Sequence, residues 1–149
     1  MLLISHAAAG AAVASVIPNP VFYIPISFAS HFVLDAVPHY HLKDESKNLY
    51  CQTAVDVVLS IMFLVFVYKF TNNISLVWGG LTASIMDLDA FFYYPGLGKY
   101  GKVTKKIFPD FISKIHGKCQ NETEEKLLGV VTQVGIILIA ITLMMINQS

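Results

Sequence analysis

The apolar segment from residue 27 to residue 39 carries three ionisable side chains at intervals of four residues: His31, Asp35 and His39. Side chains at i, i+4 and i+8 stay on one side of an α-helix, because one turn takes about 3.6 residues. The three groups therefore form a polar stripe along an apolar helix. Such groups cost roughly 3 kcal/mol or more each in hydrocarbon, so they indicate a function. Histidine and aspartate are also metal ligands, and the stripe predicts a metal site.

Other apolar runs also contain ionisable groups. In the predicted bundle these groups lie near the same end as the stripe of His31, Asp35 and His39. They are His6 in the first run, Asp56 in the third, and Asp87 and Asp89 in the fourth. Carboxylates gathered in a medium of low dielectric repel one another and need a counter-charge, yet every basic residue of the chain is a lysine, and none lies among them. A divalent cation, zinc or manganese, is the simplest counter-charge for mixed nitrogen and oxygen ligands. We predict that the metal ligands are His6, His31, Asp35 and Asp87.

Each residue also has a simpler interpretation when it is taken alone. His6 could donate a hydrogen bond between helices, Asp87 could mark a helix end, and Asp56 could stabilise a helix N-terminus through the helix dipole. The number of candidate ligands leaves two arrangements open, which are two metal ions or one ion with an outer shell of partners. The shared depth of the groups favours a metal site over the separate interpretations.

The composition identifies the elements that must position these groups. The chain has 149 residues, of which 55% are hydrophobic and 13% charged, with a mean hydropathy of +0.61. Soluble domains average about 25% charged residues, so the sequence predicts one integral membrane domain over residues 1–149. Hydrophobic runs predict an all-α polytopic bundle of about five transmembrane helices, at residues 2–17, 21–38, 50–70, 74–94 and 127–147. A net charge of zero and the lack of a basic motif argue against nucleic acid as a partner.

The residues between the fourth and fifth runs predict an amphipathic helix at the membrane interface. Apolar residues recur with helical spacing over residues 104–118, and His116 falls on or near the membrane-facing edge. A solvated basic loop is the alternative. Nine of the ten lysines fall in the connections 39–49 and 95–126. By the positive-inside rule these connections and the N-terminus are cytoplasmic, and the C-terminus is extracytoplasmic.

The motifs resemble those of small bacterial membrane proteins identified as membrane-bound metal-dependent hydrolases. The resemblance rests on His6, on the run Ser30–Asp35 followed by His39, and on Met86–Asp89. Relative to the best-characterised members, the His-x-x-x-Asp and Asp-x-Asp segments occur in the reverse order. The resemblance implies a bound metal, hydrolysis and a place in the bacterial inner membrane.

The combined expectation is metal-assisted hydrolysis of a lipid or phosphoester near the cytoplasmic face, with membrane lipid as partner. The metal would activate a water molecule. Asp56 or Asp89 would accept its proton, and His39 or His116 would protonate the leaving group. Two alternatives remain, which are a non-catalytic membrane protein stabilised by its metal and a cation carrier.

Overall fold

The structure, a computed structural model, describes residues 2–40, 49–87, 110–123 and 125–147. The described residues form no strand, and one isolated bridge joins His39 to Glu122. The helices are α1 (Leu3–Val16), α2 (Pro20–Asp35), α3 (Leu49–Thr71), α4 (Ile74–Ser84), the 3-10 turn η1 (Ile85–Asp87), α7 (Asp110–Cys119) and α8 (Lys126–Ile146). The predicted all-α fold class is confirmed.

The helix boundaries follow the hydrophobic runs closely. Asn19 ends the break between α1 and α2, where its side chain accepts a hydrogen bond from the Val21 amide at 3.0 Å, and Pro20 occupies the first turn of α2. The predicted amphipathic segment forms α7 from residue 110 onward. The last part of the predicted fourth run, residues 88–94, lies outside the described residues.

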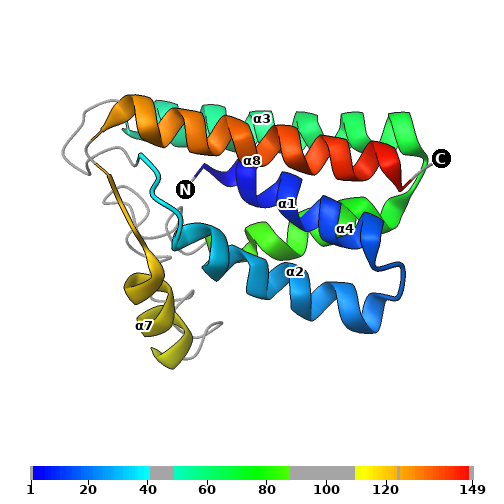
Figure 1. Ribbon diagram of the computed structural model, residues 1–149, viewed down its shortest axis with the longest axis horizontal. Coiled ribbons are helices and arrows are strands. Elements are labelled where there is room, and N and C mark those ends of the chain that lie inside the picture. Colours follow the sequence, from blue (N-terminus) through cyan, green and yellow to red (C-terminus); the bar gives the residue numbers. More distant parts are fainter. Residues whose placement is uncertain (1, 41–48, 88–109, 124, 148–149) are drawn as a thin grey trace.

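The long helices form a bundle in which consecutive helices alternate in direction (Figure 1). Helices α1, α3 and α8 run one way, and α2 and α4 run back. The start of α1, the end of α2, η1 and the start of α8 consequently lie at one end of the bundle, which we call the polar end. Helix α7 lies at this end, beside α2, and the C-terminus lies at the other end. The predicted common depth of the ionisable groups depends on this alternation.

Helix α1 is the centre of the bundle, and small residues allow its neighbours to approach. It contacts α2, α3, α4 and α8. A Cβ atom at Gly10 would collide with the backbone of Gly79 and the side chain of Ala83 on α4. Glycine and alanine at such crossings permit close backbone contact, which is the usual way in which helices pack in a membrane.

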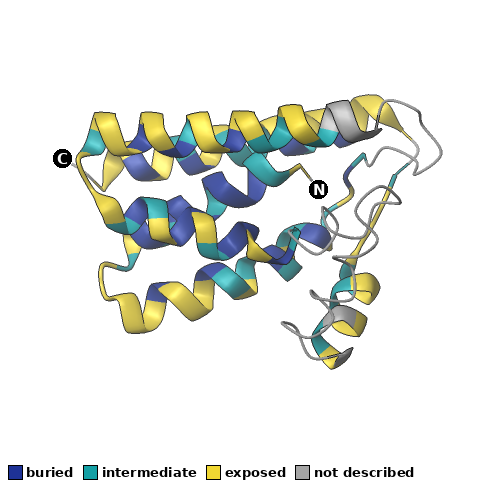
Figure 2. Ribbon diagram, turned by 180° about the vertical axis from the view of Figure 1, so that it is seen from behind, coloured by how far each residue is buried: buried dark blue, intermediate teal, exposed yellow. Residues whose placement is uncertain are grey.

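Exposed residues lie on the outer faces of the helices, and buried residues face the interior (Figure 2). Many of the exposed residues are large and apolar, whereas the buried residues include polar groups such as His6, His31 and Asp35. Exposed large apolar side chains include Phe70 at 70%, Val21 at 72% and Leu127 at 78% exposure. Two stretches, Thr53–Thr71 and Lys126–Ile146, are long and apolar enough to cross a membrane. Helix α1 and the stretch Ile74–Asp87 are apolar but shorter. The structure thus supports two candidate spans, while the count of five remains a prediction.

A short backbone pairing fixes α7 against the end of α2. The Asn121 amide donates to the Asp35 carbonyl at 2.8 Å and the His39 amide donates to the Asn121 carbonyl at 3.1 Å, while the Thr123 amide donates to the His39 carbonyl at 2.9 Å. The Asn121 side chain also donates to the Ala36 carbonyl at 3.1 Å. Because these bonds join the segments after α2 and α7, they hold α7 beside Asp35.

Candidate metal centre

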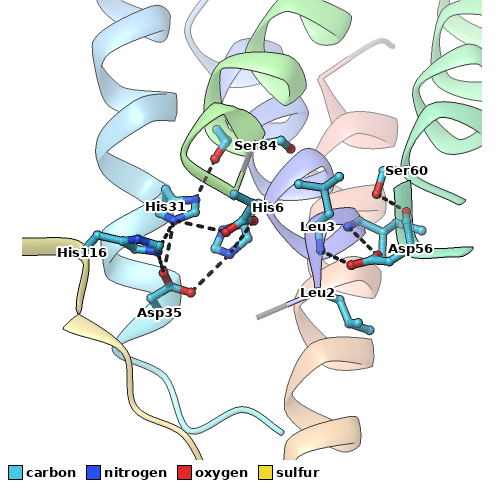
Figure 3. A network of polar contacts seen from close by, with 12 residues as sticks. Leu2, Leu3, His6, His31, Asp35, Asp56, Ser60, Ser84 and His116 are labelled. Atoms are coloured by element: carbon cyan, nitrogen blue, oxygen red, sulfur yellow. Dashed lines mark hydrogen bonds and ion pairs between the residues drawn. The ribbon is translucent and has the colours of Figure 1, made fainter. Parts of the chain in front are cut away.

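Side chains from four elements converge at the polar end of the bundle (Figure 3). The carboxylate of Asp35 is the common neighbour of three imidazoles. Its Oδ1 lies 3.2 Å from Nε2 of His6, and its Oδ2 lies 3.1 Å from Nε2 of His31 and 3.0 Å from Nε2 of His116. The Nε2 atoms of His31 and His116 are 3.1 Å apart. The same nitrogen of each ring therefore faces one small volume.

A second carboxylate faces this volume from η1. Asp87 places Oδ2 3.7 Å from Nε2 of His6 and Oδ1 3.7 Å from Nε2 of His31. Atoms that share an ion at about 2.0–2.2 Å lie about 2.8–3.6 Å apart when the angle at the ion is between octahedral and tetrahedral. The observed separations of 3.0–3.7 Å are close to this range. We name these five residues the His/Asp cluster.

A backbone carbonyl orients one of the imidazoles. His31 Nδ1 lies 2.9 Å from the Ala83 carbonyl oxygen. A carbonyl only accepts hydrogen bonds, so Nδ1 carries a proton, and in the neutral ring the lone pair of Nε2 faces the cluster. A carbonyl partner on the outer nitrogen is typical of histidines that bind metals, because it fixes the tautomer and the ring orientation.

The cluster is closed toward the bundle and partly open on one side. His6 and His31 are fully buried, whereas the side chains of His116 and Asp87 are 13% and 19% exposed. Potential ligand atoms lie within 4.8 Å of one another in two overlapping sets of three residues, one made by His6, His31 and Asp87 and the other by His31, Asp35 and His116. These groups could therefore hold a metal ion, and the two partly exposed side chains belong to α7 and η1.

Asp56, which the sequence proposed as a proton acceptor, lies against the start of α1 instead (Figure 3). Its carboxylate accepts hydrogen bonds from the amides of Leu3 at 2.7 Å and Ile4 at 3.3 Å. The first amides of a helix have no partner within that helix, and a carboxylate there satisfies them and complements the helix dipole. Asp56 thus stabilises a helix N-terminus, in line with its simpler interpretation. The stabilised helix is the neighbouring α1, whereas Asp56 itself lies on α3.

The other sequence-predicted catalytic residues are divided among three locations. His39 is buried in the pairing after α2, where its Nδ1 donates to the Val37 carbonyl at 2.9 Å, and it belongs to neither metal-binding set found among the described residues. Asp89 lies outside the described residues. His116 belongs to the His/Asp cluster, and so do all the predicted ligands His6, His31, Asp35 and Asp87.

The role of His116 as a potential ligand was missed by the sequence analysis. One signal points toward it: on α7, Phe111 and Ile115 are exposed, while Ile112 and His116 are partly buried one turn apart. That spacing gives α7 a second face directed at the bundle. The face could be found in the sequence, but its partner on α2 could not.

No protein-family model, curated protein or solved structure matches this chain. What the site can do is accordingly argued from the residues of the His/Asp cluster themselves.

Proposed function

We propose that this chain is a membrane-embedded metal-dependent hydrolase whose site acts on a lipid or phosphoester at the cytoplasmic face. The observation that carries the proposal is the convergence of three imidazole nitrogens on the buried carboxylate of Asp35, in a cluster with two partly exposed members. Structural metal sites are usually closed by protein ligands, whereas catalytic sites keep a position for water or substrate. The partial exposure of Asp87 and His116 supplies such an opening.

The donor atoms favour zinc or manganese as the metal. Imidazole nitrogen and carboxylate oxygen together suit these ions better than calcium, which prefers oxygen ligands alone. A bound divalent ion of this kind lowers the pKa of a water molecule and so supplies a nucleophile near neutral pH. In the protein, His31 is oriented by the Ala83 carbonyl, and Asp35 supplies negative charge to the same volume. Asp89 remains the sequence-based candidate for the proton acceptor.

The proposed membrane placement puts the cluster close to the headgroups of the inner leaflet. Five apolar helices would cross or enter the bilayer, with the N-terminus and the lysine-rich connections in the cytoplasm. The amphipathic helix α7 supports this placement. It carries exposed apolar side chains, Phe111 and Ile115, together with two lysines, Lys114 and Lys118. Such a helix lies in the interface plane. A site beside it would meet substrates whose ester bond lies near the membrane surface.

Hydrolysis by the purified protein tests the proposal. The detergent-solubilised chain, loaded with zinc or manganese, is assayed against a phosphodiester, a phosphomonoester and a short-chain phospholipid. We expect turnover of at least one substrate that His31→Ala abolishes and that Glu122→Gln, a change at an exposed carboxylate outside the cluster, preserves. Metal-loaded protein that hydrolyses none of these substrates, or a His31→Ala variant with full activity, would contradict the proposal.

A second function, a metal that only holds the bundle together, is favoured by one observation. The ligands come from α1, α2, η1 and α7, so one site joins four elements. In that case Asp35→Asn would lower the thermal stability of the metal-loaded protein, and neither the wild type nor the variant would have hydrolytic activity. A catalyst would instead lose turnover with its fold retained. A cation carrier is less favoured, since transporters usually bind near the midplane and this cluster lies at one end of the bundle.

A further inference from the structure

The orientation of two histidine rings decides how many ions the His/Asp cluster can hold. The rings of His6 and His31 are stacked, with centroids 4.0 Å apart and planes inclined by 22°. The lone pair of an imidazole nitrogen lies in the plane of its ring. Two nearly parallel planes at this separation do not meet within the length of a metal bond, about 2.1 Å. The two Nε2 atoms are consequently poorly placed to bind one common ion.

The two potential metal-binding sets also share one ligand atom, which can bind only one ion at a time. Nε2 of His31 belongs to both sets. A neutral imidazole nitrogen has a single lone pair, so it binds one ion at a time. The two sets therefore cannot be two independent sites. They can form one site with two ions if other groups bridge the ions.

The carboxylates have the geometry of such bridges. Asp35 directs Oδ1 toward His6 and Oδ2 toward His31, at 3.2 and 3.1 Å. Asp87 directs Oδ2 toward His6 and Oδ1 toward His31, at 3.7 Å each. Each carboxylate thus offers one oxygen beside each stacked ring. This is the arrangement in which a carboxylate bridges two ions that each bind one of the rings.

Three buried atoms on the His6 side have no hydrogen-bond partner among the described residues. They are Nδ1 and Nε2 of His6 and Oδ2 of Asp87. Nε2 of His6 also lies near Asp35 Oδ1 without the alignment of a hydrogen bond. Leaving a buried polar atom unsatisfied costs about 1–3 kcal/mol. An ion bound by Nε2 of His6 and Oδ2 of Asp87 would remove this cost for these two atoms.

We propose that the His/Asp cluster binds a pair of divalent cations bridged by Asp35 and Asp87. The first ion takes His6 and one oxygen of each aspartate. The second ion takes His31, His116 and the remaining oxygen of each aspartate. The proposal deepens the proposed function by assigning two ions to the same site. It depends on metal binding there and stands whether or not the chain is a hydrolase.

The charge of this centre selects a substrate class. Two divalent cations with two aspartates and neutral histidines carry a net charge of about +2. Pairs of ions about 3.5–4 Å apart stabilise both the attacking and the leaving oxygen of phosphoryl transfer. The centre therefore favours an anionic phosphoester over an uncharged carboxylic ester as substrate.

Metal stoichiometry and magnetic coupling test the pair directly. The full chain in detergent is saturated with Mn²⁺, washed free of excess ion, and analysed for metal per chain and by electron paramagnetic resonance. We expect two Mn²⁺ per chain and the spectrum of a magnetically coupled pair. His6→Ala should retain one ion per chain and give the spectrum of an isolated Mn²⁺ ion. Glu122→Gln, with its exposed carboxylate outside the cluster, should retain the coupled pair.

The possible outcomes separate this inference from the proposed function. One ion per chain at saturation, with an isolated-ion spectrum, would overturn the pair while leaving a single-metal hydrolase possible. Two coupled ions without hydrolysis would support the pair and overturn the enzyme. A chain that binds neither Mn²⁺ nor Zn²⁺ would overturn both, provided that its thermal unfolding shows a folded protein. Equal metal content in the wild type and His6→Ala would also overturn the pair.

Discussion

The two ends of the bundle are built from different chemistry. At the polar end, buried His6, His31 and Asp35 lie together. Toward the other end, which we call the apolar end, the same helices pack through a hydrophobic cluster. Its buried members include Ala14, Tyr23, Val67, Leu76, Ala140 and Met144. Every long helix of the bundle contributes to this cluster.

The comparison indicates that stability and function are separated along the helix axes. Close contact between small residues holds the apolar end without any need for a ligand. The polar end gathers carboxylates and imidazoles away from water, which is unfavourable unless another charge compensates them. The apolar end can therefore keep the bundle assembled without a metal, which leaves the polar end available for the proposed metal centre. The following four changes test this division, from the largest expected effect to the smallest.

The largest effect should come from crowding the crossing of α1 and α4. A Cβ atom at Gly79 would collide with the backbone of Gly10 and the side chain of Ala14, neither of which can rotate away. We expect Gly79→Leu to destabilise the bundle by at least about 3 kcal/mol or to prevent assembly. Gly135→Leu is the matched control, because no atom lies within 4 Å of its added Cβ. Thermal unfolding in detergent measures both, and equal stability of the two variants would contradict the packing account.

The second effect should be confined to the polar end. Asp35→Asn removes the charge that contacts His6, His31 and His116. We expect the affinity for Zn²⁺ or Mn²⁺ to fall by more than about 100-fold, since the loss of even an outer-shell partner costs about 10–100-fold. Calorimetric titration measures the affinity, and the unfolding temperature of the metal-free variant serves as the control for folding. Unchanged affinity would exclude Asp35 as a ligand.

The third change separates helix capping from catalysis at Asp56. Because its carboxylate accepts hydrogen bonds from Leu3 and Ile4, Asp56→Ala should lower stability by about 1–2 kcal/mol. Metal content should stay at the wild-type value. Asp56→Asn, which keeps an acceptor oxygen, should lose less stability than the alanine variant. If turnover were lost while stability was retained, the role of proton acceptor that the sequence predicts for Asp56 would be supported.

The smallest effect is expected at the exposed face of α7. Phe111 is 62% exposed on the helix that carries His116, so in a bilayer its ring is available for contact with lipid. We expect Phe111→Ser to weaken metal binding in vesicles by less than about 10-fold and to have no effect in detergent, because membrane contact only assists the placement of α7. Lys114→Gln is the control on the same helix. A loss as large as that of Asp35→Asn would mean that α7 depends on lipid for its place in the fold.

The helices were predictable from the sequence because apolar length and breakers act locally. The run predicted at residues 50–70 is α3, and Pro20 begins α2 as an N-terminal proline should. Their common end was predictable as well, since consecutive helices in a bundle alternate in direction. This was enough to predict that His6, Asp35 and Asp87 lie together.

Contacts between distant segments were not predictable from spacing alone. The position of His116 depends on backbone hydrogen bonds between Asn121 and the end of α2. No pattern in the sequence predicts that pairing. Asp56 was assigned to the site because its depth is right, but depth does not specify the side of the bundle. The stacking of His6 on His31 likewise results from the close approach of α1 to its neighbours.

The most direct test of a metal centre at the polar end is the position of the ion itself. Crystals of the metal-loaded chain, measured with X-rays at the absorption edge of the bound element, locate it by anomalous scattering. We expect the strongest peak within about 2.0–2.2 Å of Nε2 of His31 and an oxygen of Asp35. The central claim would be wrong if the peaks of a fully loaded crystal lay elsewhere and the histidines were hydrogen-bonded directly to Asp35.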